Sequence, residues 1–189
     1  MVKEHLKEKK LLYRVQVDHD KDAFGELYDL YVEKIYRFVF FKISDRAETE
    51  DVVSEIFLKT WNYLINKEKG EVDSFSGFVY QVARNAVIDW YRERKKRSTY
   101  LSPEPVEDME VADEAASSVM ETKQDVDRTF AVMKKMKHEY QEILMLRFVE
   151  ELSIKEIAAI SGKGQTAVRV TLHRAVKKMK ELLDQENKI

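Results

Sequence analysis

Apolar residues recur at helical spacing in three stretches of the N-terminal half of the chain. They are Phe24, Leu27, Tyr28, Tyr31, Ile35 and Phe38; then Val53, Ile56, Phe57, Trp61 and Leu64; then Val79, Val82, Ala83, Ala86, Val87 and Trp90. Apolar repeats on one side of a helix predict amphipathic helices. A polar loop, Asn66–Ser76, separates the second stretch from the third, and a weaker pattern, Leu11–Val17, precedes the first. We therefore predict a small helical domain over residues 20–97, beside which the weaker helix can pack.

The C-terminal part of the chain carries two short helical patterns, Thr129–Met136 and Tyr140–Phe148, and then a more specific signal. Ser153-Ile154-Lys155-Glu156 has the spacing of a capping box, which predicts the start of a helix over Ile154–Ile160. Gly162 can adopt the positive φ that ends such a helix in a tight turn. A second helix is predicted from about Gln165 to Leu183, with Val168, Leu172, Ala175 and Met179 as its buried stripe.

A short helix, a glycine turn and a longer helix with a polar outer face are typical of the helix-turn-helix, here Leu152–Ala175. The outer face of the second helix carries Gln165, Thr166, Arg169, Val170, His173 and Arg174, followed by Lys177 and Lys178. Residues near its N-terminus would meet base edges, and the neighbouring cations would hold phosphates. An ordinary helical hairpin with a solvated face is the alternative.

The strip over residues 98–125 differs in composition from both halves. It contains both prolines, Pro103 and Pro105, many acidic residues and few apolar ones, so it is predicted to be a linker. One interpretation is a solvated tether. The other is an acidic segment that mimics nucleic acid and occupies a basic channel in a partner.

Composition supports an all-α fold, with two small helical domains joined by this linker and a C-terminal domain over residues 126–183. The 189 residues include only five Gly and two Pro, and they include no Cys, which excludes disulfides and thiolate metal sites. Met1–Lys10 has no apolar core of a signal peptide, and no apolar run approaches the ~18 residues of a membrane span. We therefore expect a soluble protein of the cytoplasm.

Net charge is −2, which is unusual for a DNA-binding protein, but the charge is unevenly distributed. Residues 1–100 hold 19 basic and 18 acidic residues, and residues 101–127 hold 1 basic and 9 acidic residues. Residues 128–189 hold 13 basic and 8 acidic residues. The helix-turn-helix therefore lies in a basic region, so the total charge does not count against DNA binding.

A second basic cluster ends the third predicted helix of the N-terminal domain. It comprises Arg92, Arg94, Lys95, Lys96 and Arg97, directly after Trp90 and Tyr91. Cations beside aromatic rings suit single-stranded nucleic acid, because unstacked bases need both charge neutralisation and π-faces. Pairing of the cations with the helix C-terminus is the alternative. The second helix differs, since Glu50, Asp51, Ser54 and Glu55 share a polar side that suits a basic protein partner rather than DNA.

Three stretches together resemble the extracytoplasmic-function (ECF) group of bacterial sigma-70 factors. Residues 50–61 (EDVVSEIFLKTW) are similar to the helix that binds core RNA polymerase. Residues 75–92 (FSGFVYQVARNAVIDWYR) resemble the helix that melts the promoter and reads its minus-ten element. Leu152–Ala175, ending in LHRA, resembles the unit that reads the minus-thirty-five element. The order of the three stretches and the acidic linker also match.

The resemblance implies a transcription initiation factor that is not an enzyme and uses no cofactor or metal. Its partners would be the clamp helices of the largest polymerase subunit, promoter DNA and an anti-sigma factor. Core polymerase would bind Asp51, Val52, Ser54, Glu55, Phe57, Leu58 and Trp61. The melted minus-ten strand would contact Phe75, Tyr80, Arg84, Asn85, Asp89 and Arg92. The linker would thread toward the active-site and RNA-exit channels.

Three positions depart from the family pattern. Val170 and Thr171 stand where Ser and then Arg are frequent, and Gly164 stands where a capping Ser is frequent. The reading helix thereby loses a cation and a hydroxyl, which alters the expected base preference.

Two other classes of protein are weighed against this interpretation. A stand-alone repressor or activator would bind its operator tightly without polymerase, but it has no need of an aromatic and basic melting helix. An adaptor that only resembles a sigma factor would not bind core polymerase. An enzyme is disfavoured, because His5, His19, His138 and His173 lack metal-ligand spacing and no Gly-rich phosphate loop is present.

Overall fold

The structure, a computed structural model, describes residues 2–66, 68, 70–101 and 121–186. All the regular elements of these residues are helices, which confirms the predicted all-α class. The chain divides into two compact units, Met1–Val111 and Ala112–Ile189, and each has its own core.

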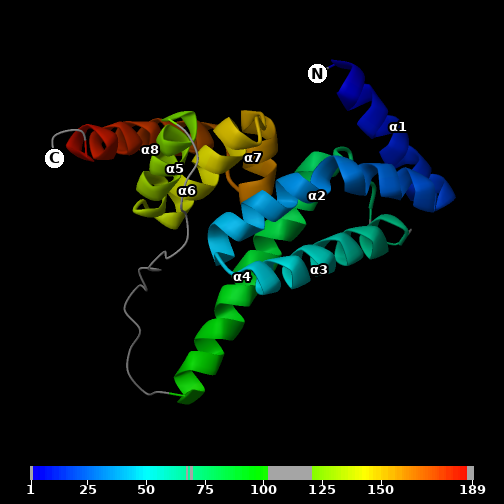
Figure 1. Ribbon diagram of the computed structural model, residues 1–189. Helices are drawn as coiled ribbons and strands as arrows, with labels where there is room; N and C mark the ends of the chain where they lie inside the picture. Colours follow the sequence, from blue (N-terminus) through cyan, green and yellow to red (C-terminus); the bar gives the residue numbers. More distant parts are fainter. Residues whose placement is uncertain (1, 67, 69, 102–120, 187–189) are drawn as a thin grey trace. The chain divides into compact units, whose positions relative to one another are not determined.

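Four helices build the N-terminal unit: α1 (Val2–Asp18), α2 (Lys21–Ile43), α3 (Arg46–Leu64) and α4 (Phe75–Leu101). Figure 1 shows α2 and α3 running antiparallel, and α4 crosses both of them and continues beyond the bundle. Helix α1 packs on α2 and on α4. One end of α4 therefore lies inside the unit and the other end projects from it.

Short polar residues set the connections between these helices. Asp20 accepts hydrogen bonds from the amides of Asp22 and Ala23 and so caps α2. The Ala23 amide and Arg14 hold the pKa of the Asp20 carboxyl below its ordinary value. Ser44 ends α2 in the left-handed conformation, with φ 57°, and Asp45 immediately caps α3 through the amide of Glu48. The chain thus reverses between α2 and α3 in two residues.

The three apolar faces predicted from periodicity meet in one core. Its fully buried members include Leu27, Ile35, Phe38, Ile56, Val79 and Ala83. Aromatic rings join the helices edge to face, with centroids 4.6 Å apart for Tyr28 and Phe57 and 5.1 Å apart for Phe24 and Trp61.

The first helix is longer than its apolar pattern indicates. The pattern predicts Leu11–Val17, whereas α1 spans Val2–Asp18, with Leu11, Leu12 and Val15 buried and Val17 half exposed. Charged residues occupy the first turns of α1, and one of them, Glu8, is buried. Apolar periodicity cannot detect an inward-facing position that is occupied by a charged residue.

The C-terminal unit contains α5 (Glu121–Lys134), α6 (His138–Leu144), a π-helical turn η1 (Met145–Val149), α7 (Ile154–Ser161) and α8 (Gln165–Glu186). Helix α8 packs against α5, α6 and α7 (Figure 1). The predicted linker over residues 98–125 begins and ends in helix, because α4 reaches Leu101 and α5 starts at Glu121. An established helix extends at little cost per residue. The rest of the predicted linker lies outside the described residues.

The predicted helix Tyr140–Phe148 is α-helical only as far as Leu144. The amide of Glu150 bonds to the carbonyl of Met145 at 3.0 Å, which is the wider π-helical spacing. A regular helix would place Phe148 on the same face as Leu144, which is buried, but the wider turn leaves Phe148 61% exposed. Arg147 then donates to the carbonyl of Leu152 at 2.9 Å and fixes the entry to α7.

The helix-turn-helix forms as predicted. Ser153 and Glu156 make both hydrogen bonds of the capping box. Gly162 ends α7 with φ 67° and ψ 24°, and its amide bonds to the carbonyl of Ala158. Lys163, in the turn, forms an ion pair with Glu139 of α6.

Gly162→Ala is expected to destabilise the C-terminal unit by about 1 kcal/mol, because an L side chain is strained at this positive φ although the space around it is open. Gly70→Ala is the control, since Gly70 also has open space, lacks a positive φ and lies in a loop. Denaturant unfolding followed by circular dichroism, with hydrogen exchange of α7 and α8, measures both variants. Equal effects of the two substitutions would contradict the argument.

Candidate functional site

The N-terminal half of α8 presents a continuous polar face to solvent. Burial of Val168 and Ala175, both 0% exposed, fixes the rotation of the helix against the unit. The predicted DNA-contacting side chains are all exposed on the opposite side: Gln165, Thr166, Arg169, Val170, His173 and Arg174. The structure therefore brings this whole predicted set together on one surface.

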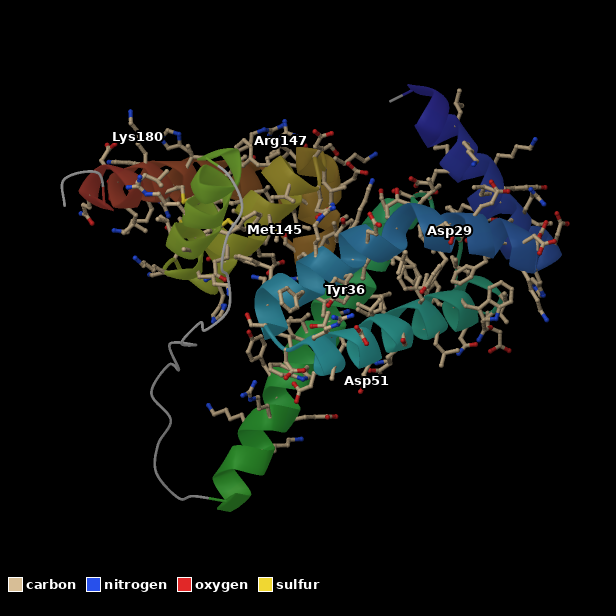
Figure 2. The ribbon with its side chains drawn as sticks, viewed as in Figure 1. Asp29, Tyr36, Asp51, Met145, Arg147 and Lys180 are labelled. Atoms are coloured by element: carbon tan, nitrogen blue, oxygen red, sulfur yellow. The ribbon has the colours of Figure 1, made fainter. Side chains whose placement is uncertain are left out.

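Cations dominate the electrostatics of this face. Arg169, Arg174 and Lys177 form no ion pair with the acidic side chains of the described residues, whereas Lys178 lies 3.7 Å from Glu181. Lys180 extends the basic line farther along α8 (Figure 2). Val170 is 44% exposed among these polar groups and offers an apolar contact of the kind that a thymine methyl group accepts.

On α4, the predicted strand-contacting residues fall into two groups. Asn85, Asp89 and Arg92 are exposed and follow one another along one side, with Arg92 and Asp89 paired at 3.2 Å. Gln81 and Lys96 lie on the same line, one turn before and one turn after. Lys96 belongs to the predicted basic cluster, whereas Gln81 was not predicted, although helical spacing from Asn85 was the signal that could have found it. Arg84 is partly buried.

The other two predicted strand contacts are buried instead. Phe75 is 0% exposed and Tyr80 is 1% exposed. The ring of Phe75 lies 5.2 Å from that of Tyr31, and the ring of Tyr80 meets that of Phe38 edge to face at 5.6 Å. Neither ring can stack on a base in this conformation, because both faces are covered by the core of the N-terminal unit. In this conformation both rings are core residues, and strand contact through them stays a prediction.

The projecting end of α4 carries the predicted basic cluster. Arg92, Arg94, Lys95 and Lys96 are exposed, and the side chain of Arg97 lies outside the described residues. The guanidinium of Arg94 lies 5.0 Å from the centre of the Trp90 ring, within cation–π range.

Tyr91 anchors this end of α4 to α2. Its hydroxyl donates to the carbonyl of Lys42, and its ring meets that of Trp90 edge to face at 4.9 Å. Burial raises the pKa of the Tyr91 phenol above its ordinary value, an effect that the charge of Arg94 partly offsets. Tyr91 thus packs and anchors, while Trp90 remains partly exposed beside the cations.

The outer side of α3 is polar and acidic around one apolar residue. Asp51, Ser54 and Glu55 are exposed, and Leu58, one turn beyond Ser54 and Glu55, is 61% exposed (Asp51 in Figure 2). Glu55 pairs with Lys59 at 2.6 Å. An exposed leucine within an acidic face is a feature of protein-binding surfaces rather than of DNA-binding ones.

Two of the residues predicted to bind a partner through α3 are internal. Val52 is 8% exposed and Phe57 is 4% exposed, because they lie on the side of α3 that packs against the core. In this conformation both side chains lie beneath the exposed side of α3 and are not part of its surface. Trp61 is partly exposed at the margin, with one edge against Phe24.

One partly exposed aromatic pair was missed by the sequence prediction. The rings of Tyr36 and Phe40 on α2 stack nearly parallel, with centroids 5.8 Å apart and an interplanar angle of 8°. Tyr36 is labelled in Figure 2. Their i, i+4 spacing was the available signal, but both lie outside the apolar face of α2 that the periodicity predicts.

Neither a metal centre nor a membrane span is found in the described part of the chain. No group of three or more potential ligands gathers there, and no helix there is both long and apolar enough to cross a bilayer.

Sequence comparison relates both units to one family. Residues 27–97 match the family described as Sigma-70 region 2, and residues 130–179 match Sigma-70, region 4. The ECF RNA polymerase sigma factor BldN of Streptomyces coelicolor is 30% identical over 164 residues, which are 87% of this chain and 61% of BldN. The ECF RNA polymerase sigma factor SigX of Bacillus subtilis is 26% identical over 172 residues, or 88% of each chain.

Two solved structures share the fold of this chain, and one of them is a sigma factor. CnrH, in complex with the cytosolic domain of CnrY, superposes with a TM-score of 0.67 at 18% identity, over 95% of this chain and 98% of the CnrH chain. The sigma factor RpoE, in complex with the anti-sigma factor NepR from Bartonella quintana, gives 0.67 at 19% identity, over 87% and 98%.

Tyr91→Phe is expected to lower the free energy of unfolding by about 1 kcal/mol at neutral pH, through loss of the bond to Lys42. Because the folded pKa of Tyr91 is raised, the unfolded chain loses this proton first as the pH rises. The stabilisation is therefore complete below about pH 10 and declines above it.

Denaturant unfolding followed by tryptophan fluorescence measures this difference, because Trp61 and Trp90 both lie in the N-terminal unit. Tyr13→Phe serves as the control, since Tyr13 is 63% exposed. A stability difference between wild type and Tyr91→Phe that stayed constant up to pH 11 would contradict the assignment.

Proposed function

Because the chain belongs to the ECF group of the sigma-70 family, we propose that it binds core RNA polymerase and directs it to promoters, with its two units reading separate promoter elements. The observation that carries this proposal is that one chain holds both matched regions, and each presents an exposed polar face on a well-packed helix. It acts by binding and not by catalysis, and it works in the cytoplasm, where its polymerase is.

The C-terminal unit reads the duplex at the minus-thirty-five element. The turn at Gly162 delivers the N-terminus of α8 to the major groove, where Gln165, Thr166 and Arg169 reach base edges. Val170 replaces a polar contact with an apolar one, which favours a thymine methyl group at the corresponding base. His173 and Arg174, one turn farther on, contact bases or the adjacent phosphates.

The N-terminal unit holds the melted minus-ten strand along the outer side of α4. Asn85 and Asp89 supply hydrogen-bonding groups, and Arg92, assisted by Arg84, supplies charge. The basic end of α4 then neutralises phosphates, and the exposed part of Trp90 offers a face for an unstacked base. The burial of Phe75 and Tyr80 restricts strand contact to this outer side.

Core polymerase binds the outer side of α3. Leu58 is the apolar centre of this surface, and Asp51, Ser54 and Glu55 form its polar surroundings. Such an arrangement, with an apolar anchor inside a charged rim, suits the clamp helices of the largest subunit if these are basic. Trp61 contributes at the margin.

An anti-sigma protein is a further partner. CnrH and RpoE were each solved in complex with another protein, CnrY and the anti-sigma factor NepR respectively. Because this chain shares their fold, we expect a protein of that kind to hold it inactive by covering the exposed faces.

Transcription with purified core polymerase and a genomic promoter library tests the proposal directly. Defined transcripts should start only when this protein is added, and their 5′ ends should share two upstream elements. No specific transcript, combined with tight operator binding by the free protein in gel shifts, would identify a stand-alone regulator instead.

Leu58→Ala, combined with Asp51→Lys, is expected to weaken core binding about five- to thirtyfold, because the loss of an anchor together with a rim charge costs roughly 1–2 kcal/mol. Both residues are exposed, so the melting temperature should stay nearly unchanged. Competition against a labelled sigma factor for core measures the affinity. Glu181→Lys, an exposed charge reversal in the other unit, controls for net charge, and equal affinities of all three proteins would refute the α3 assignment.

Arg169→Ala is expected to cost roughly 1–3 kcal/mol in promoter binding by the holoenzyme and to relax base preference at one minus-thirty-five position. Lys177→Ala should instead weaken binding to all sequences and lower the salt dependence by about one counterion. Lys178→Ala is the control, because Lys178 is paired with Glu181 on the flank of α8. Binding across salt concentrations and a library of minus-thirty-five variants separates these outcomes, and indistinguishable profiles would argue against readout by α8.

A further inference from the structure

Helix α1 precedes residues 27–97, the part of the N-terminal unit that matches the family, yet it places a buried carboxylate at the start of α4. Glu8 is only 7% exposed. Charged groups are rarely buried unless several partners satisfy them. The partners of Glu8 therefore indicate what α1 does.

One oxygen of Glu8 accepts hydrogen bonds from the first two amides of α4. The distances are 3.1 Å to the amide of Phe75 and 3.4 Å to that of Ser76. The other oxygen accepts from the hydroxyl of Tyr31 on α2. The first amides of a helix have no partner within the helix and carry partial positive charge, so an anion is favoured there. Glu8 thus caps α4 from a different helix.

The capping is shared with a residue of the loop itself. The Ser74 hydroxyl accepts a hydrogen bond from the next amide of α4, that of Gly77, at 3.2 Å. A local residue and a residue of α1 therefore satisfy successive amides of the same helix. The start of α4 is fixed only when α1 is in place.

Gln16, two turns farther along α1, holds the loop that leads into α4. Its amide oxygen accepts from the amide of Val72 at 2.8 Å, and its amide nitrogen donates to the carbonyl of Val72 at 3.2 Å. Both backbone groups of one loop residue are thus paired with one side chain. These two hydrogen bonds fix the path and orientation of the chain three residues before α4 begins.

At its other end, α4 is anchored to α2 by the bond from Tyr91 to the carbonyl of Lys42. The outer side of α4, with Asn85, Asp89 and Arg92, lies between the two anchors. A change in the start of the helix would shift its axial position or rotate that side, and successive residues of a helix are separated by about 100°. Precise placement of this side therefore depends on both anchors.

We propose that α1 is a positioning element for strand binding, with Glu8 and Gln16 as its positioning residues. They act through α4, by fixing where it begins and which side it presents to the melted strand. This inference rests on the proposed function of α4 as the strand-binding helix. Core binding through α3 does not depend on these two residues.

The test measures two affinities of the reconstituted holoenzyme, using full-length chains. One is for a labelled single-stranded oligonucleotide with the non-template minus-ten sequence of a mapped promoter. The other is the affinity of the factor for core polymerase. Thermal unfolding of the free factor is recorded beside them. A purely structural role would change stability and both affinities together.

Gln16→Met preserves length and removes both bonds to Val72. We expect strand affinity to fall about three- to tenfold, the loss typical of one or two hydrogen bonds, while core affinity stays within about twofold. Lys9→Met, on the exposed side of α1, is the matched control and should leave both affinities unchanged.

Glu8→Ala should reduce strand affinity further, and Glu8→Gln should restore most of it, because the amide oxygen can still accept from the α4 amides. If Glu8→Ala fails to fold, Gln16→Met still decides the question, since Gln16 is only partly buried.

Normal strand affinity of Gln16→Met would overturn the inference, as would a parallel loss of core affinity and stability. Asn85→Ala and Arg92→Ala separate this result from a failure of the proposed function. If they weaken strand binding and Gln16→Met does not, α4 binds the strand without help from α1. If they too have no effect, the assignment of α4 fails, and the inference fails with it.

Discussion

The N-terminal unit depends on the packing of one side of α4 against α2 and α3. Phe75, Val79, Tyr80 and Ala83 are buried along that side, and their burial leaves the opposite side of the same helix in solvent. Because a helix is rigid, the core decides which polar groups are presented and at what angle. The surface proposed to bind the strand is therefore a consequence of the core, and a change in core packing would be transmitted to Asn85, Asp89 and Arg92 without touching them.

The same principle operates in the C-terminal unit with different means. Burial of Val168 and Ala175 sets the rotation of α8, and the capping box and Gly162 set where it begins. An ion pair from Lys163 to Glu139 and the bond from Arg147 to Leu152 hold the turn to the preceding helices. Each unit thus combines a local terminus signal with a distant anchor. In α4 the distant anchor comes from α1, which adds a helix outside the matched region to the machinery proposed for promoter opening.

Charge is arranged to suit separate partners and not a single one. Clusters of exposed cations lie on α8 and at the end of α4, whereas α3 exposes the acidic residues Asp51 and Glu55 near Leu58. The net charge of −2 also includes residues 101–127, which hold 1 basic and 9 acidic residues. From this distribution we expect the free chain to bind DNA weakly and to gain affinity when polymerase supplies further contacts.

Sequence alone determined the all-α class, the three amphipathic helices, the capping box, the glycine turn and the outer face of α8, because each of these depends on residues within a few turns of one another. Tertiary structure decided the rest. The family resemblance implied partner contacts through Phe75, Tyr80, Val52 and Phe57, but the structure buries all four side chains in the core. Periodicity within one helix does not say which neighbouring helix covers a given side chain. Phe148 is exposed because a π-helical turn changes the register. In the sequence, Glu8 resembles an ordinary surface charge. Only the packing of α1 reveals that it accepts hydrogen bonds from the amides of Phe75 and Ser76, 67 and 68 residues away. Pairings over such distances depend on how helices pack, and local patterns carry no record of them.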